Sequence, residues 1–208
     1  ILLIAFPKAN TIISTALYLP IMFMLIGLIL RGVAFDFRVK AREQHQLWWN
    51  WAFIFGSTLA AVMQGYMLGR YVTGVADGLQ FWLFAMAIGM AVLATYTLIG
   101  ACWLIIITEG ELQHIAIGWA KLAWWPVIAG LVLISLASPW VSPLVVDKWF
   151  KLPEIFVLGF IPLITAGALL VMRWYFNQPT LSTHRSWMPF VLMMLSLFMG
   201  AVGLAYSM

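Results

Sequence analysis

One long uncharged stretch of the chain limits how it can fold. Gln80 to Ile107 is a stretch of 28 residues without a charged side chain. At about 1.5 Å per residue, a helix of this length exceeds a hydrocarbon core about 30 Å thick, so it can cross a bilayer with some tilt. The composition agrees, because 64% of the residues are hydrophobic and only 9% are charged. The chain is therefore predicted to be an integral membrane protein.

Further apolar runs of similar length predict an all-α, polytopic membrane helix bundle. We expect six complete transmembrane helices plus one partial helix, all within a single transmembrane domain that covers residues 1–208. The expected helices are residues 11–35, 47–69, 80–107, 122–141, 155–175 and 187–206. Because the chain starts at Ile1 inside an apolar run and ends at Met208 directly after one, we expect an internal fragment that lacks both ends of a longer protein.

Small residues recur at four-residue spacing on the expected helix 47–69. Gly56 precedes Ala60, and Gly65 precedes Gly69. Positions four apart share a helix face, and small residues there let neighbouring backbones approach. The two pairs therefore predict two faces of close helix contact.

Basic residues are divided unevenly between the two sides of the membrane. The connections after the first, third and fifth complete helices contain seven basic residues, whereas the opposite side contains four. The seven are Arg31, Arg38, Lys40, Arg42, Lys121, Arg173 and Arg185, and the four are Lys8, Arg70, Lys148 and Lys151. Because cytoplasmic loops are enriched in Lys and Arg, the loop 31–46 is predicted to be cytoplasmic. The net charge of +4 follows this topology and indicates no nucleic-acid partner.

Residue types that bind metals or perform catalysis are sparse. His45, His114 and His184 fall in loops or at helix ends, so none is predicted to be an axial haem ligand within a spanning run. The single cysteine, Cys102, excludes an intrachain disulfide and is expected to be a small buried hydrophobe. The sequence has no metal-ligand spacing and no glycine-rich phosphate loop. We expect no metal site, and no catalysis by this chain alone.

The most charged segment, residues 30–43, reads LRGVAFDFRVKARE. If the first complete helix continues through it, Arg31 and Arg38 share one face and Asp36 points elsewhere. One interpretation is an ordinary basic flank, with Asp36 and Lys40 as a surface pair. The other is that Arg31 and Asp36 face the protein and serve a proton path, or a quinone or haem-propionate contact in a partner subunit.

Several blocks follow one another along the chain in a recognisable order. The longest is LILRGVAFDFR at 28–38, and LYLP precedes it at 17–20. The shorter blocks that follow are QGYMLG at 64–69, GACWLI at 100–105, TEGELQ at 108–113 and WFKLP at 149–153. Together they resemble subunit II of the bd-type quinol oxidases, especially the cyanide-insensitive branch, over nearly the whole chain.

The resemblance implies a haem-free membrane subunit of a complex that oxidises quinol and reduces O2 to water. Haems b and d and the quinol-oxidation loop are then expected in the partner, subunit I. The family fold implies two four-helix bundles and one extra helix, of which this chain would supply the end of the second helix through the eighth. Further expected partners are membrane lipid, a quinone and a small accessory subunit, with a quinone or lipid in a structural role. The implied location is the bacterial cytoplasmic (inner) membrane.

The resemblance also implies roles for individual residues. The family block maps onto Arg31 to Arg38, and the family's acid is present as Asp36. Asp36 is expected to assist proton entry from the cytoplasmic side, and Arg31 to anchor buried negative charge near subunit I. Arg38 and Glu109 are further candidates for the proton pathway or the subunit interface. The family's N-terminal acidic motifs would lie before Ile1, so a proton path within this chain would be incomplete.

Two alternatives stay open on the sequence. A secondary transporter with a broken-helix substrate site is favoured by Pro20 and Pro162, which interrupt two expected helices. A purely structural scaffold for subunit I predicts the same apolar bundle as proton delivery does. Copurification with a haem-bearing subunit would support the oxidase, whereas substrate uptake by a colourless chain would support the transporter.

Overall fold

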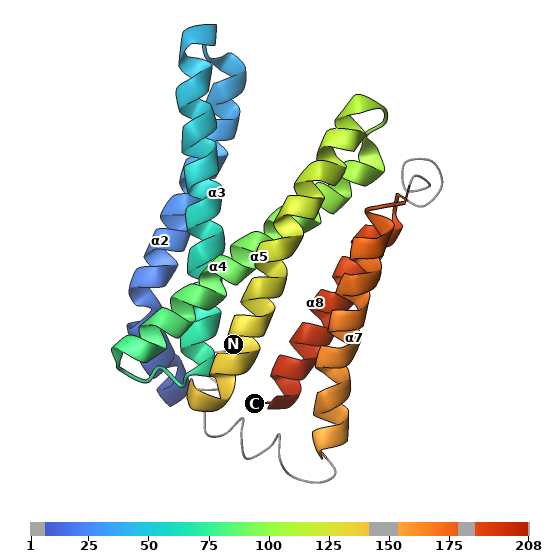
Figure 1. Cartoon of the computed structure of the whole chain (residues 1–208). Coiled ribbons are helices and arrows are strands. Elements are labelled where there is room, and N and C mark those ends of the chain that lie inside the picture. The colour runs from blue at the N-terminus through green and yellow to red at the C-terminus, as the bar shows by residue number, and fades with distance from the viewer. Residues whose placement is uncertain (1–6, 142–153, 179–185, 208) are drawn as a thin grey trace. The chain divides into compact units, whose positions relative to one another are not determined.

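A computed structural model of the chain describes residues 7–141, 154–178 and 186–207, with side chains described over 15–137, 160–178 and 186–203. Within these ranges all regular structure is helical, which confirms the all-α prediction (Figure 1). The helices are α2 (Pro7–Lys40), α3 (Glu43–Val72), α4 (Leu79–Ile107), α5 (Glu111–Val141), α7 (Glu154–Tyr175) and α8 (Met188–Ser207). The expected partial helix at 1–6 and the block at 149–153 lie outside the described residues.

Four helices have the length and composition of membrane spans. They are Thr15–Lys40, Glu43–Val72, Leu79–Ile107 and Glu111–Ala137. The apolar parts of α7 and α8 within the described side chains are shorter, Phe160–Tyr175 and Met188–Gly203. Such helices satisfy their own backbone hydrogen bonds, as the bilayer core requires. The chain is a membrane protein.

Two stretches that were expected to be loops are helical. α2 continues through the charged segment to Lys40 and α3 begins at Glu43, so only Ala41 and Arg42 interrupt the helix within the expected loop 31–46. Similarly, α5 begins at Glu111 rather than at residue 122. A hydrophobic run marks the part of a helix that crosses lipid, whereas Lys, Arg, Glu and Gln favour helix and extend it into the polar zone.

Contacts between residues divide the chain into two compact units, residues 1–93 and 94–208, which we call unit 1 and unit 2. In unit 1, α2 packs along α3 and the first part of α4 packs on the other face of α3. In unit 2, α7 packs along α8. The boundary falls within α4, so this helix contributes to both units.

Close backbone approach holds unit 1 together. A Cβ atom built on Gly56 of α3 would lie 2.7 Å from the carbonyl oxygen of Gly27 on α2. A Cβ atom on Gly65 would lie 2.7 Å from the Cα atom of Gly89 on α4. These contacts confirm the two predicted close-contact faces of α3, and they identify α2 and α4 as the respective neighbours.

The core of unit 2 is built instead from large side chains. Its least exposed large residues are Leu98, Ile105, Leu169 and Met172. Cys102 belongs to the same cluster and is fully buried, which confirms its expected packing role. Interlocking of these side chains supplies the van der Waals packing that associates helices in lipid.

Candidate functional site

The charged segment lies on α2, where buried positions recur every seven residues. Pro20, Gly27 and Ala34 are all buried. A seven-residue repeat is typical of two helices that pack along their length. Asp36 follows Ala34 by two residues, about 200° around the helix. The helix therefore presents Asp36 on the side opposite its contact with α3.

Arg31 lies at the edge of the α2–α3 contact. Its guanidinium carbon is 5.8 Å from the centroid of the Phe53 ring on α3, a cation–π distance, and the side chain is otherwise exposed. Arg38 is seven residues further along, on the same side of α2, and is also exposed. The structure thus agrees with the expected separation of the two arginines from Asp36.

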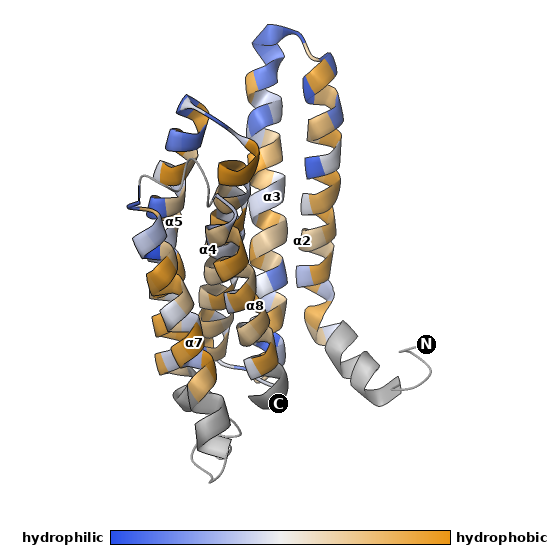
Figure 2. Cartoon of the chain, turned by 90° about the vertical axis from the view of Figure 1, so that its right-hand side faces the viewer, coloured by the Kyte–Doolittle hydropathy of each residue, from blue (hydrophilic) through white to orange (hydrophobic). Residues whose placement is uncertain are grey.

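Asp36 has no counter-charge of its own chain in the described structure. It is exposed, and among the described residues the expected surface pair with Lys40 is not formed. The neighbouring Phe37 stacks on Trp49 of α3 with ring centroids 5.1 Å apart, which ties the two helices together at this level. Hydrophilic residues gather at the same end of α2 and α3 (Figure 2). Asp36 is therefore a carboxylate on a free helix face near the polar end of unit 1.

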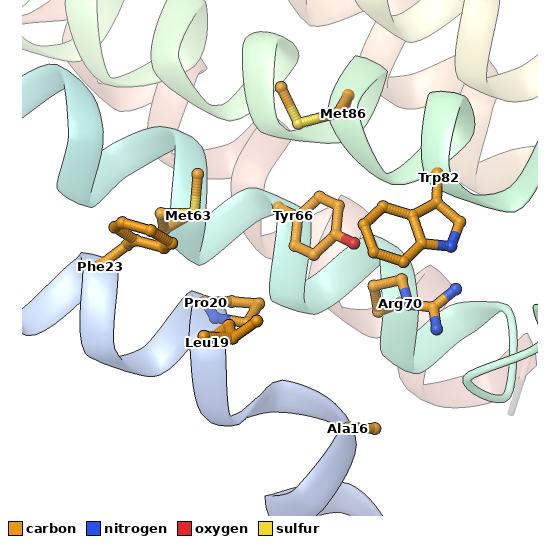
Figure 3. A pocket seen from close by; sticks show the side chains of 9 residues that line it. All are labelled: Ala16, Leu19, Pro20, Phe23, Met63, Tyr66, Arg70, Trp82 and Met86. Atoms are coloured by element: carbon orange, nitrogen blue, oxygen red, sulfur yellow. The ribbon is translucent and has the colours of Figure 1, made fainter. Parts of the chain in front are cut away.

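Unit 1 also contains a pocket of about 260 Å³ that sequence reasoning missed. Side chains from α2, α3 and α4 line it (Figure 3). The lining residues are Ala16, Leu19, Pro20, Phe23, Met63, Tyr66, Arg70, Trp82 and Met86. The wall is mostly apolar, and the guanidinium of Arg70 and the Tyr66 hydroxyl lie at one end of it beside the indole of Trp82 (Figure 3).

Arg70 is the buried cation of this pocket and is only 4% exposed. Its guanidinium donates hydrogen bonds to the carbonyl oxygens of Ala76 and, at 3.4 Å, Val75. Asp77, almost fully exposed, lies 3.5 Å from Nη2, and the guanidinium carbon is 5.3 Å from the Trp82 ring centroid. In the sequence Arg70 marked only a loop, because its contacts come from the following turn and the next helix.

The corner between α4 and α5 carries the other acidic candidate, Glu109. Gly110 turns the chain with φ = +67°, a conformation that glycine adopts without steric cost. Gln113 is buried, and its Nε2 donates to the carbonyl oxygen of Ile105 at 2.8 Å. Thr108 Oγ1 donates to the Leu104 carbonyl oxygen at 2.6 Å. Glu109 itself is exposed, so the corner is held by its neutral polar residues and not by this carboxylate.

Comparison with known families separates the oxidase from the transporter. The family described as cytochrome bd terminal oxidase subunit II matches residues 1–208, the whole chain. The chain belongs to this family. The resemblance noted in the sequence blocks is thereby confirmed, and a component of a terminal oxidase is favoured over a transporter. No individual curated protein matches the chain significantly.

As a subunit II of a cytochrome bd terminal oxidase, the chain belongs to a complex that contains haem and at least one partner subunit. The structure describes two of the three histidines. His45 and His114 are both exposed, each in the first turns of its helix, and the unit 1 pocket has no histidine in its lining. Among the described side chains, no group of three His, Cys, Asp or Glu could hold a metal ion.

Proposed function

We propose that this cytochrome bd oxidase subunit II supports subunit I and helps to deliver protons to it from the cytoplasm. The observation that carries the proposal is the position of Asp36, exposed on the side of α2 that faces away from α3. An ionisable side chain facing lipid near a membrane boundary is costly, so such a residue is expected to meet water or a partner protein. Subunit I is the expected partner, and a proton path along this face is the expected use.

The arrangement of the helices in the membrane belongs to the same proposal. All six helices would cross the bilayer as one transmembrane domain, with the α2–α3, α4–α5 and α7–α8 connections on the cytoplasmic side. The excess of basic residues at these connections supports this orientation. Asp36, near the end of α2, and Glu109, in the corner between α4 and α5, would then both lie on the cytoplasmic side. Arg31 and Arg38 would hold negative charge near subunit I.

Cofactors and further partners follow from the resemblance. Haems b and d and the oxidation of quinol would belong to subunit I, so this chain would perform no redox step itself. The unit 1 pocket, with apolar walls and Arg70 at one end, suits the chain of a structural quinone or lipid. A small accessory subunit stays a prediction. Extraction of quinone and lipid from the purified complex tests for a bound quinone or lipid. The subunit composition of the complex tests for the accessory subunit.

The role of Asp36 is tested by Asp36→Asn in the intact complex. Asparagine keeps the size of the side chain but cannot carry a proton, so we expect quinol-driven oxygen consumption to fall by about tenfold or more. Glu43→Gln is the matched control, because Glu43 is an exposed acid at the start of α3 and is expected to leave turnover unchanged. Turnover and proton uptake in Asp36→Asn equal to the wild type would exclude proton delivery through Asp36.

The same variant distinguishes delivery from a purely structural role. Under the proton-delivery proposal, Asp36→Asn still copurifies with subunit I and keeps its haem absorbance while each complex turns over slowly. If the variant instead loses subunit I and the remaining complexes turn over normally, this subunit is a scaffold. Asp36→Glu keeps the carboxylate and is expected to restore most of the activity.

A further inference from the structure

An arginine in unit 2 has a buried nitrogen atom that finds no hydrogen-bond acceptor in the part of the chain that the structure describes. Arg173 lies in the last turn of α7, and its Nη1 is covered by protein but makes no hydrogen bond among the described residues. Its guanidinium carbon lies 5.7 Å from the centroid of the Trp124 ring on α5. The side chain as a whole is half-buried, so part of it is exposed. The cation therefore packs on an indole while its side chain remains partly open to the molecular surface.

The indole that supports Arg173 is itself held in place. Trp124 is buried, and its Nε1 donates a hydrogen bond of 2.9 Å to the carbonyl oxygen of Leu169, one turn before Arg173 on α7. This bond links α5 to α7 and orients the ring face toward the guanidinium. The position of the cation is therefore set by two helices and is not that of a free surface side chain.

No acid of the described chain neutralises this position. Lys121 precedes Trp124 by three residues on α5, close to the same helix face, and adds a second positive charge. Glu111 lies about 15 Å further along α5 from Lys121, and Glu154 begins α7 about 28 Å from Arg173 along the axis. Within the described residues Arg173 forms no ion pair. Among the described residues these two cations have no counter-charge, which suits them to bind an anion.

The surrounding residues indicate where that anion comes from. Trp119, Trp125 and Trp174, on α5 and α7, are each more than half exposed. Tryptophan is enriched at the level of the lipid headgroups, where phosphates are abundant. Lys121 also ends the half-polar first part of α5, before its uncharged part begins at Leu122. If α7 crosses the membrane, as proposed above, Arg173 lies at this same boundary.

We propose that Arg173 and Lys121, with the Trp124 indole as a support, bind the phosphate of an anionic phospholipid on unit 2. A planar guanidinium donates two parallel hydrogen bonds to a phosphate, and a nearby ammonium adds a point charge. A carboxylate of a partner protein would satisfy the same chemistry, but it would have to be placed among exposed aromatic side chains, which suit lipid. The phospholipid is the occupant that the aromatic surroundings favour.

The test uses the whole oxidase complex, stripped of lipid and titrated with phosphatidylglycerol, with bound lipid counted by native mass spectrometry. Arg173→Gln removes the guanidinium and its charge, so phosphatidylglycerol is expected to bind about tenfold more weakly, which corresponds to about 1.4 kcal/mol of binding free energy. Arg173→Lys keeps the charge but lacks the planar guanidinium, and it is expected to give an intermediate loss of lipid affinity. Arg42→Gln is the matched control, because Arg42 is an exposed arginine of unit 1, and it is expected to bind lipid as the wild type does.

Three results would overturn the proposal. Equal phosphatidylglycerol binding by Arg173→Gln and the wild type would show that this cation does not hold lipid. Displacement of the lipid by an equal concentration of inorganic phosphate would indicate a free-anion site. Loss of subunit I from Arg173→Gln, with lipid binding unchanged, would indicate a partner carboxylate. Because lipid is counted independently of turnover, a complex that binds lipid as expected but oxidises no quinol would contradict only the proposed function.

Discussion

The two units of this subunit associate their helices by opposite means. In unit 1, backbone meets backbone, because the added Cβ of Gly27, Gly56, Gly65 or Gly69 would lie within 2.8 Å of a main-chain atom of the facing helix. In unit 2, the glycines at 100, 118, 167 and 200 have nothing within 4 Å of an added Cβ atom. There the contact is made by large buried side chains such as Leu169 and Met172.

The difference shows that glycine content alone does not report helix packing in a membrane protein. Lipid is as apolar as the helix surfaces, so association depends on van der Waals contact rather than on escape from water. Contact is gained either by removing side chains until the backbones touch or by interlocking large ones. Unit 1 is therefore expected to be sensitive to added volume, and unit 2 to lost volume.

The largest effect is expected from Gly56→Ala in unit 1. The new methyl group would lie 2.7 Å from the Gly27 carbonyl oxygen and 2.9 Å from the Arg31 nitrogen, both main-chain atoms that move only with α2. We expect the free energy of unfolding to fall by about 3 kcal/mol, measured by detergent-induced unfolding of the purified complex. The matched control is Gly167→Ala, which has open space around it and is expected to be neutral or slightly stabilising. Equal effects of the two substitutions would remove the distinction between the units.

A smaller effect is expected from Leu169→Ala in unit 2. Leu169 is 1% exposed in the core, so its truncation leaves a cavity between α5 and α7. In the same unfolding assay we expect the free energy of unfolding to fall by about 2 kcal/mol. This is at the low end for a buried leucine, because in lipid the side chain gains little from being removed from water. Leu170→Ala is the control, since this neighbour is 62% exposed and its removal leaves no cavity. A neutral Leu169→Ala would show that unit 2 also depends on backbone contacts.

The smallest effect is expected at the turn after α3. Val75 has φ = +61°, a left-handed conformation that is costly for a β-branched residue. Val75→Gly removes this strain but adds entropy to the unfolded chain, so a net stabilisation of up to about 1 kcal/mol is expected in the same unfolding assay. Gly74→Ala, at φ = +62°, is expected to destabilise by a similar amount. A destabilising Val75→Gly would mean that the valine side chain contributes more by packing than it loses by strain.

Much of the fold was accessible from the sequence because hydropathy is a property of consecutive residues. Runs such as 80–107 identified the membrane class and the helices, and the block at 28–38 identified the family that the comparison then confirmed. Helix ends were less accessible: α2 and α5 continue past their apolar runs, since helix formation does not stop where lipid does. The small pairs on α3 predicted close contacts but not the helices that make them.

The candidate sites divide in the same way. Asp36 and Arg31 stood out in the sequence because they are charges beside a long apolar run, and their separation around α2 follows from helical spacing. Arg70 and Arg173 did not stand out, since each looked like one more basic residue at a helix end. They became candidate site residues only through their contacts with aromatic rings of other helices, Trp82 and Trp124.

The sequence by itself determined that the chain is a membrane-embedded, all-α subunit of a bd-type terminal oxidase family. Composition, the length of hydrophobic runs and local motifs depend only on residues that follow one another in the chain. Only the tertiary structure decided that Gly56 meets Gly27 and that the guanidinium of Arg173 lies over the Trp124 ring. Such pairings join residues far apart in the chain. They depend on how helix faces fit together, which no local pattern of residues specifies.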